Sequence, residues 1–182
     1  MFTSSRHVPG VELAGFIHPG LIDCLPSKAL LDEWNTRETA LVDTYPNRVP
    51  PLATLAYGDA AHMGQMSKYK AKVAGAKAAI TLPPQEHGGN CDTKDLSRES
   101  KVYFPVYVKG GGLYVGGLHF SQGDGEITFF GAIEMAGWIY MKVILVKRGI
   151  SKYGVKNPIF KPSPITPKYD DYLIFEGISV DE

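Results

Sequence analysis

Hydrophobic and polar positions alternate in the second part of the chain, after the paired prolines at 83 and 84. Between residues 102 and 108 an apolar side chain recurs at every second position, which is the period of a β-strand with one buried face. Pro105 lies within this run and indicates an edge strand or a bulge, because proline has no N–H to donate to a neighbouring strand.

Turn signals separate this strand from others that follow it. The KGGG sequence at 109–112 is typical of a hairpin turn, and the SQGDG sequence at 121–125 is typical of another. The apolar runs between such signals predict further strands over 113–120, 126–133, 138–147 and 172–180. Trp34 and Trp138 are both expected to lie in the core.

The first part of the chain favours helices and loops. Apolar residues at helical spacings over 25–41, preceded by Ser27 as a candidate N-cap, predict an amphipathic helix. The alanine- and lysine-rich run at 67–80 predicts a second helix. Three prolines within 43–51 predict a loop, and residues 6–22 predict one short strand between turns. We therefore predict a mainly β, α+β fold with a β-meander or sandwich-like core.

Length and charge restrict the class of protein. The 182 residues suit a single domain, with a mixed helical and loop part at 1–83 and a β-rich part at 84–182 that carries the motifs. Nineteen Lys and Arg balance nineteen Asp and Glu, so no net field attracts nucleic acid or an anionic membrane. No apolar run approaches the roughly 20 residues that span a bilayer. We expect a soluble, cytoplasmic protein that binds neither nucleic acid nor membrane.

The predicted hairpin over SQGDG brings chemical groups together. Antiparallel strands lie about 5 Å apart, so a loop of about five residues would return Glu126 close to His119. Asp124 lies at the glycine-rich tip of this loop, where the backbone can approach a ligand. Glu134 follows Glu126 by eight residues, about 26 Å along a straight strand. It would join the site only if the chain bends near Gly131.

A second block, HGGNCD at 87–92, combines an imidazole, an amide and a carboxylate with two glycines. Zinc accepts nitrogen and oxygen ligands at about 2.0–2.2 Å and lowers the pKa of a bound water towards ~7. The backbone amides of Gly88 and Gly89 could bind an oxyanion. Cys91 ranks below the metal as a source of the nucleophile, because Asp92 beside it disfavours the thiolate.

Both blocks also have purely structural interpretations. Asp124 between two glycines can serve turn geometry alone. The second block can be a loop in which Asn90 and Asp92 bind the backbone. The GDGE sequence could instead hold calcium through oxygen ligands without a histidine. His7 and His62 are interpreted as structural or exposed.

The longest motifs are PPQEHGGNCDTKDLSRESKVYFPVYV at 83–108 and GGLHFSQGDGEITFFGAIEM at 116–135. They resemble the acetamidase/formamidase family, and most closely its formamidase branch. The similarity extends to SSRHVPGVELAGFIHPGLI near the start and to the tail KNPIFKPSPITPKYDDYLIFEGISVDE. It therefore covers nearly the whole chain, with several long motifs in the same order.

The resemblance implies hydrolysis of a short linear amide, such as formamide, to a carboxylic acid and ammonia, with a divalent metal such as zinc. The roles that chemistry suggests for the matching positions fall into three sets. The expected catalytic residues are Glu126 as general base, Asp124 at the leaving ammonia, and Glu134. The expected substrate-binding residues are Gly88, Gly89, Asn90 and Gln122. The expected metal ligands are His87, Asp92 and His119.

The chain departs from the family pattern in places. Gly116-Gly117 stands where the family usually has Gly-Asp, which removes a carboxylate that would orient His119. Glu99 and Phe130 replace a small residue and a cysteine. Family members are longer on both sides, so the resemblance implies an incomplete amidase domain, and we expect a homo-oligomer. The alternative to an enzyme is a non-catalytic truncated homologue that serves as a structural or oligomer-forming module.

Overall fold

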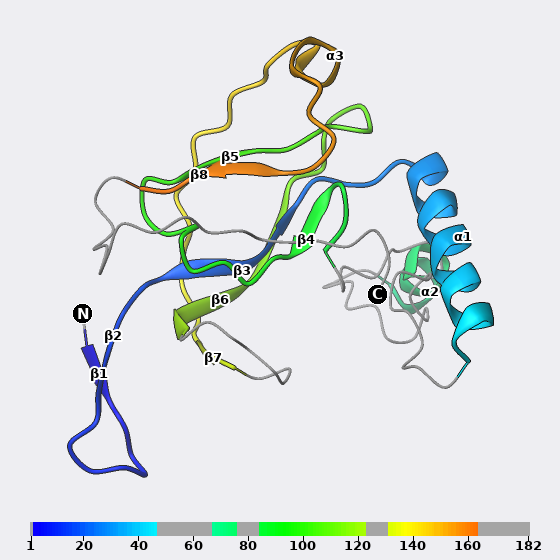
Figure 1. Ribbon diagram of the computed structural model, residues 1–182. Coiled ribbons are helices and arrows are strands. Elements are labelled where there is room, and N and C mark those ends of the chain that lie inside the picture. The colour runs from blue at the N-terminus through cyan, green and yellow to red at the C-terminus, as the bar shows by residue number, and fades with distance from the viewer. Residues whose placement is uncertain (1, 47–66, 76–83, 123–130, 164–182) are drawn as a thin grey trace.

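The protein is described by a computed structural model, which covers residues 2–46, 67–75, 84–122 and 131–163. Its centre is a four-stranded antiparallel sheet with the strand order β4-β3-β6-β7. These four strands are labelled in Figure 1. The strands of this sheet are β3 (His18–Asp23), β4 (Gly88–Asn90), β6 (Tyr114–Gln122) and β7 (Ala132–Glu134).

Two smaller sheets and three described helices complete the fold. The paired strands are β1 (Phe2–Ser4) with β2 (Glu12–Ala14), and β5 (Lys101–Tyr103) with β8 (Ile159–Lys161). The helices are α1 (Lys28–Thr44), α2 (Lys68–Gly75) and α3 (Gly149–Tyr153). The predicted α+β class, mainly β, is confirmed. None of the helices in the described ranges has the length and apolar composition to cross a bilayer.

Strand β4 approaches the inner strand β3 very closely. A Cβ atom on Gly88 of β4 would lie 2.5 Å from the Ile22 carbonyl oxygen, and Gly88 and Gly89 have φ values of 109° and 116°. Only glycine tolerates both the contact and the conformation. The paired glycines of the HGGNCD motif are thus needed for the β3–β4 pairing.

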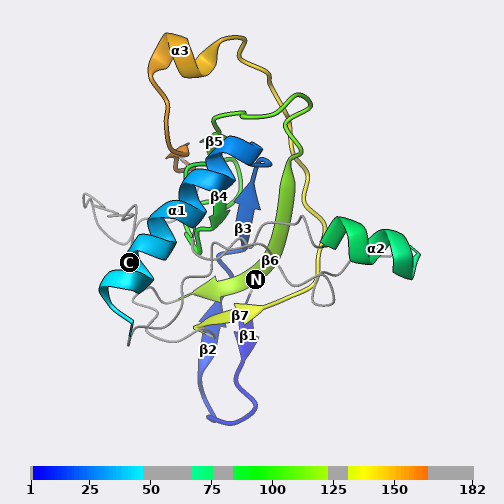
Figure 2. The same cartoon turned by 90° about the vertical axis from the view of Figure 1, so that its right-hand side faces the viewer.

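Helix α1 begins where the sequence predicts. The Ser27 side chain accepts a hydrogen bond from the Leu30 N–H at 3.1 Å, so it satisfies one of the unpaired amides of the first turn. Leu30, Trp34 and Glu38 are buried at four-residue spacing, which defines the inner face. Figures 1 and 2 show α1 beside β4, and the Trp34 ring lies 4.6 Å from the His87 ring.

The expected hairpin at KGGG is wrong. Strand β5 pairs with β8, whereas β6 pairs with β3 and β7. All three glycines of the turn have positive φ, and the Gly111 carbonyl accepts a hydrogen bond from the Leu25 N–H at 2.9 Å. The turn therefore packs against the segment before α1 and does not fold β5 onto β6.

The expected strand at 138–147 is also wrong, because these residues form neither helix nor strand. Trp138 is 91% exposed and not a core residue, whereas Trp34 is 0% exposed as expected. Residues 6–22 contribute to two strands, not one, and α1 continues past residue 41 to Thr44. The second helix is confirmed over Lys68–Gly75. The rest of that run and the expected strand at 172–180 lie outside the described residues.

Candidate active site

A row of polar side chains crosses the sheet at one end of β3. In the strand register His119 of β6 is paired with His18 on one side and with Glu134 on the other. Directly paired residues of antiparallel strands point to the same face and lie about 4.5–5.5 Å apart. The two imidazole rings are 5.2 Å apart and perpendicular. The sheet therefore presents two histidines and a carboxylate side by side.

His18 is buried, and both of its ring nitrogens have partners. Nδ1 donates to the Phe16 carbonyl oxygen at 2.5 Å, and Nε2 lies 3.1 Å from the side-chain amide of Gln122. The predicted substrate-binding residue Gln122 is therefore held by His18. The sequence analysis assigned His18 no role. The signal that could have identified it is the His-Pro-Gly sequence at 18–20, within a motif that resembles the family.

Asp92 reaches the same place from the loop after β4. Its N–H donates to the Gly20 carbonyl oxygen at 2.9 Å, and its φ is 44°. One carboxylate oxygen, Oδ1, lies 3.7 Å from Nδ1 of His119, and the other accepts a hydrogen bond from the Asn90 amide. The 3.7 Å separation is an electrostatic contact longer than a hydrogen bond. Asp92 and His119 thus face each other across the end of the sheet, with Asn90 orienting the carboxylate.

Gly20 makes this approach possible. A Cβ atom at this position would lie 2.6 Å from Cε1 of His119 and 2.7 Å from Oδ1 of Asp92. A side chain at position 20 of β3 would therefore push Asp92 and His119 apart. No role for Gly20 was predicted from the sequence.

Glu134 joins the site by a different route from the one expected. Strand β7 folds back on β6, with Ser121 opposite Ile133 and Gln122 opposite Ala132. Ser121 and Gln122 belong to β6, so the predicted loop does not begin at Ser121, and the rest of the predicted turn at 121–125 lies outside the described residues. This register places Glu134, an exposed residue, opposite His119. Asp124 and Glu126 lie outside the described residues.

His87 lies at the other end of β3. Its carbonyl oxygen accepts a hydrogen bond from the Cys24 N–H at 3.1 Å. Cys24 is six residues from His18, about 20 Å along a strand. The buried His87 ring packs on Trp34, and its Nδ1 has no hydrogen-bond partner among the described residues. Burial lowers the pKa of His87 to about 4, although the charge of Glu86 opposes this shift.

The expected zinc ligands are therefore only partly assembled. Asp92 and His119 lie together, but His87 does not join them. Within the described ranges, no three His, Cys, Asp or Glu side chains are grouped so that they could hold a metal ion. The described residues alone thus do not fit a complete zinc site.

A charged network holds the loop that carries His87. The Glu86 carboxylate accepts hydrogen bonds from the Trp34 indole at 2.6 Å and from both terminal nitrogens of Arg37 at 2.9 and 3.1 Å. Burial alone would raise the pKa of Glu86, but these hydrogen bonds outweigh it and lower the pKa. The Gly88 N–H donates to the Gln85 carbonyl oxygen at 3.0 Å, so it is not a free oxyanion donor.

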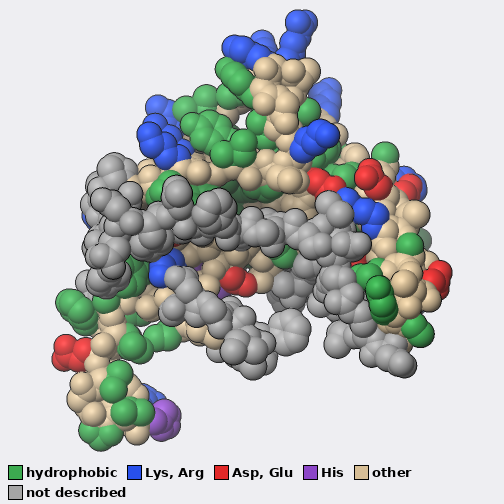
Figure 3. Space-filling model, viewed as in Figure 1, with side chains coloured by type: hydrophobic (Ala, Val, Ile, Leu, Met, Phe, Trp, Pro, Cys, Tyr) green, Lys and Arg blue, Asp and Glu red, His purple; other side chains and the backbone are tan. Residues whose placement is uncertain are grey.

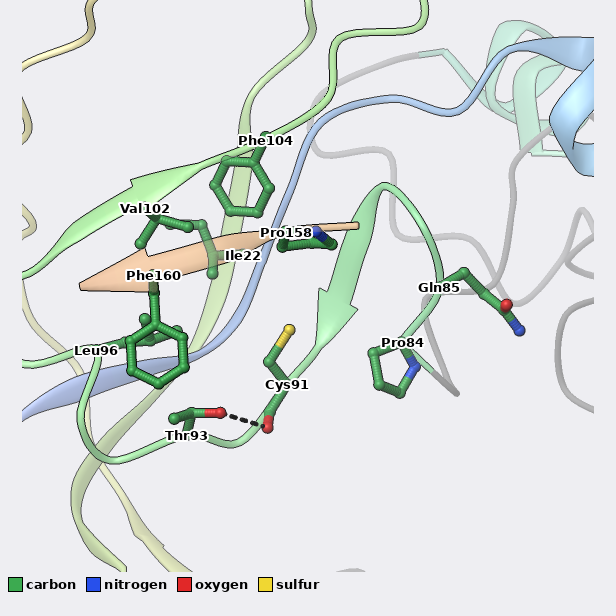
Figure 4. Close-up of a pocket in the computed structure, with 10 residues that line it drawn as sticks. All are labelled: Ile22, Pro84, Gln85, Cys91, Thr93, Leu96, Val102, Phe104, Pro158 and Phe160. Carbon is green, nitrogen blue, oxygen red and sulfur yellow. Dashed lines mark hydrogen bonds between the residues drawn. The ribbon is translucent and has the colours of Figure 1, made fainter. Parts of the chain in front are cut away.

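Cys91 points away from the His119 site. Its thiol enters an apolar pocket between the β5–β8 pair and β3, as Figure 4 shows. The cavity measures about 40 Å³, and its lining includes Ile22, Leu96, Val102, Phe104 and Phe160. Asn90 bonds to Asp92 and Asp92 faces His119, whereas Cys91 between them lines the pocket. This placement agrees with the low rank of Cys91 as a nucleophile.

Comparison with known proteins agrees with the motifs. Residues 1–182 match the Acetamidase/Formamidase family. The chain is 64% identical over 182 residues to a Formamidase from Methylophilus methylotrophus and 51% identical over 179 residues to an Acetamidase from Mycolicibacterium smegmatis. These matches include 100% and 98% of this chain but 45% and 44% of the relatives. The chain therefore spans less than half the length of these relatives.

A solved structure is also similar to this chain over the whole length of the chain. A gamma lactamase from Delftia acidovorans is 67% identical to this chain and superposes with a TM-score of 0.81. The match covers 100% of this chain and 45% of that one. The chain belongs to the acetamidase/formamidase family.

Proposed function

We propose that the protein hydrolyses the C–N bond of short linear amides, with formamide and acetamide as first substrates. The observation that carries this proposal is the family match over the whole chain, with relatives that bear the names Formamidase and Acetamidase. The site supports it, because the His119 imidazole lies 3.7 Å from the Asp92 carboxylate and Glu134 is paired with His119 on the neighbouring strand. Amide hydrolysis needs such groups to move protons at neutral pH.

Each step of the proposed reaction requires a proton transfer. A base takes a proton from water as the water oxygen adds to the amide carbon. The C–N bond then breaks as the nitrogen receives a proton, which yields the carboxylic acid and ammonia. We assign the first transfer to Glu126 and the second to Asp124, as predicted from the sequence. Glu134 and the Asp92–His119 pair are the described groups that would orient the amide and exchange protons with it.

The test is ammonia release from formamide and acetamide. Glu126→Gln and Glu134→Gln should each lower kcat, by about 10²–10⁴-fold for the residue that acts as general base. Glu12→Gln on β2 is the matched control, because Glu12 is exposed and lies in the β1–β2 hairpin. Turnover by Glu126→Gln equal to that of the natural chain would reject its assignment as the base.

A zinc ion stays a prediction from the sequence, and no step above depends on it. Asp92 and His119 are the described residues that would bind it, and such an ion would supply Lewis-acid chemistry. Metal analysis of the purified protein tests the expected ligand set. If the set is right, His119→Ala and His87→Ala should both lower the bound zinc. An effect of His119→Ala alone would remove His87 from the set.

A non-catalytic, oligomer-forming module is the second candidate. The observation that favours it is the exposure of apolar side chains, with Trp138 and Tyr140 91% and 97% exposed. A folded protein that releases no ammonia, and that forms an oligomer in light-scattering measurements, would support this function over hydrolysis.

A further inference from the structure

Residues 138–146, here called the apolar segment, connect β7 to α3 without joining any sheet. Figures 1 and 2 show the connection as an open trace that runs from one end of the molecule to the other. Among the described residues, its backbone forms one hydrogen bond, from the Gly149 N–H to the Val146 carbonyl oxygen. An extended backbone with free N–H and C=O groups can accept a neighbouring strand.

The side chains of the apolar segment are unusually exposed for their type. Trp138 and Tyr140 are 91% and 97% exposed, and Val143, Ile144 and Leu145 are each more than 70% exposed. Lys142 is the single charged residue of the segment. Soluble proteins rarely expose a continuous apolar surface of this size unless it binds a partner.

The exposed area is sufficient for a stable interface. A buried aromatic side chain removes about 150–250 Å² from water, and each aliphatic one removes about 100 Å². Covering the five side chains above would therefore bury roughly 600–800 Å². One partner of a standard protein interface contributes about 800 Å².

The exposure on both sides of the segment distinguishes between kinds of partner. Exposure alternates over 138–141, where Trp138 and Tyr140 are more exposed than Ile139 and Met141, but Val143, Ile144 and Leu145 are exposed to similar extents. Adjacent residues of an extended chain point in opposite directions, so both sides are exposed over 143–145. A membrane surface would cover one side only. A strand that is apolar on both sides is typical of the interior of a protein sheet covered on both faces.

The charge around the segment indicates what lies at the rim of the partner. Residues 135–163 contain no Asp or Glu but six basic residues, which are Lys142, Lys147, Arg148, Lys152, Lys156 and Lys161. Figure 3 shows Lys and Arg side chains interspersed with hydrophobic ones at the end of the molecule that carries α3. A complementary partner is apolar at its centre and acidic at its rim.

We propose that the apolar segment is the docking surface for the part of the family fold that lies outside this chain. The same stretch is within the 64% identical match to the Methylophilus formamidase, which contains this region as 45% of its length. In that protein the remaining 55% is available to cover the segment. The partner is thus a polypeptide equivalent to this remainder, and it covers residues 138–146.

Hydrogen exchange tests the proposal without reference to amidase activity. The amide hydrogens of residues 138–146 should exchange within seconds in this chain alone. They should exchange at least 100-fold more slowly in the aligned segment of the intact Methylophilus formamidase. Fast exchange in the intact relative would overturn the proposal, and this experiment does not depend on refolding a fragment.

Reconstitution tests the same surface in this chain. The probe is the Methylophilus polypeptide outside the matched region, expressed with a tag and mixed with this protein. A one-to-one complex should form, and Tyr140→Asp or Val143→Asp should weaken it at least tenfold. Tyr69→Asp is the control, because Tyr69 is 79% exposed and lies on α2.

Two outcomes assign the segment to a different partner and would overturn the proposal. The first is protection of residues 138–146 in this chain alone together with a dimer in light scattering, which indicates a second copy. The second is protection by anionic phospholipid vesicles that the Methylophilus polypeptide does not reproduce. Loss of amidase activity in a variant that still binds the polypeptide would bear on the proposed function and not on this surface.

Discussion

Gly20 is the residue on which the Asp92–His119 pair depends most directly. A methyl group at this position would lie 2.6 Å from the His119 ring and 2.7 Å from the Asp92 carboxylate. Real Cβ atoms do not make such contacts, so both side chains would have to shift. Gly20→Ala should therefore lower the free energy of unfolding by about 1–3 kcal/mol and lower kcat/KM for formamide. Urea unfolding and ammonia release measure the two effects.

The control for this substitution is Gly149→Ala. A Cβ atom on Gly149 would lie 3.7 Å from the Val146 side chain, which is an ordinary contact. Gly149 begins α3, where alanine is a better helix former than glycine. Unchanged activity and equal or higher stability are expected. A Gly20→Ala protein that behaves like the control would contradict the proposed close approach.

Gly117 offers a way to add a group beside His119. The sequence resemblance places an aspartate at this position, and a Cβ atom here would lie 3.9 Å from Nε2 of His119. The φ of 54° is one that aspartate tolerates better than most residues. Gly117→Asp should therefore orient the imidazole and raise kcat/KM for formamide by about tenfold, as carboxylate partners of histidine do elsewhere.

Gly116→Asp adds the same charge one residue earlier and serves as the control. A Cβ atom on Gly116 would face the Tyr114 and Leu21 side chains, so the carboxylate points away from His119. An equal gain from both substitutions would mean that added negative charge, and not the position of the group, raises the activity.

The site residues on β6 and β7 could be proposed from the sequence, but their arrangement could not. His119 and Glu134 belong to recognisable motifs, whereas the register that pairs them across β6 and β7 is not visible in either motif. Register in a hairpin follows the loop, and a one-residue change reverses every side chain. His18 and Gly20 enter the site only through the pairing of β3 with β6, which joins positions about a hundred residues apart.

At the scale of the elements, the two tryptophans provide a direct comparison. Trp34 is fully buried on α1 and bonds to Glu86, whereas Trp138 is 91% exposed in the apolar segment. Trp34→Ala should lower the free energy of unfolding by about 3–5 kcal/mol, the usual cost of removing a large core side chain. Trp138→Ala should change it by less than about 0.5 kcal/mol. Comparable losses in urea unfolding would show that the segment is buried in this chain.

This comparison also explains why some elements were predictable and others were not. Helix α1 depends on local features, the Ser27 cap and the four-residue spacing of Leu30, Trp34 and Glu38, which a sequence displays. The run at 138–147 has the composition of a buried strand, but composition does not say which strand lies beside it. The prediction of a hairpin at KGGG was wrong for a related reason. The glycines of this turn pack against Leu25 and do not connect two paired strands.

On the scale of the whole molecule, two buried ionisable groups act on stability in opposite directions. Burial raises the pKa of Asp23 from 3.8 to about 6. The contribution of Asp23 to the free energy of unfolding is therefore complete below pH 3.8 and is lost as the pH rises through 6. Burial lowers the pKa of His87 from 6.5 to about 4, so its contribution is complete above pH 6.5 and is lost as the pH falls through 4. Between about pH 4 and 6 the two effects oppose each other.

Removing each group in turn should separate these effects. Without His87, the unfolded chain no longer takes up the extra proton at low pH, so His87→Gln should gain stability on acidification from pH 6 to 4.5, relative to the natural chain. Asp23→Asn should lose stability over the same range, because the proton that the folded state retains on Asp23 is gone. Each difference approaches about 1.4 kcal/mol per pH unit, measured by urea unfolding.

His7→Gln, at an exposed histidine, should follow the natural chain. Shifts of the same sign in His87→Gln and Asp23→Asn would mean that burial does not set these two pKa values.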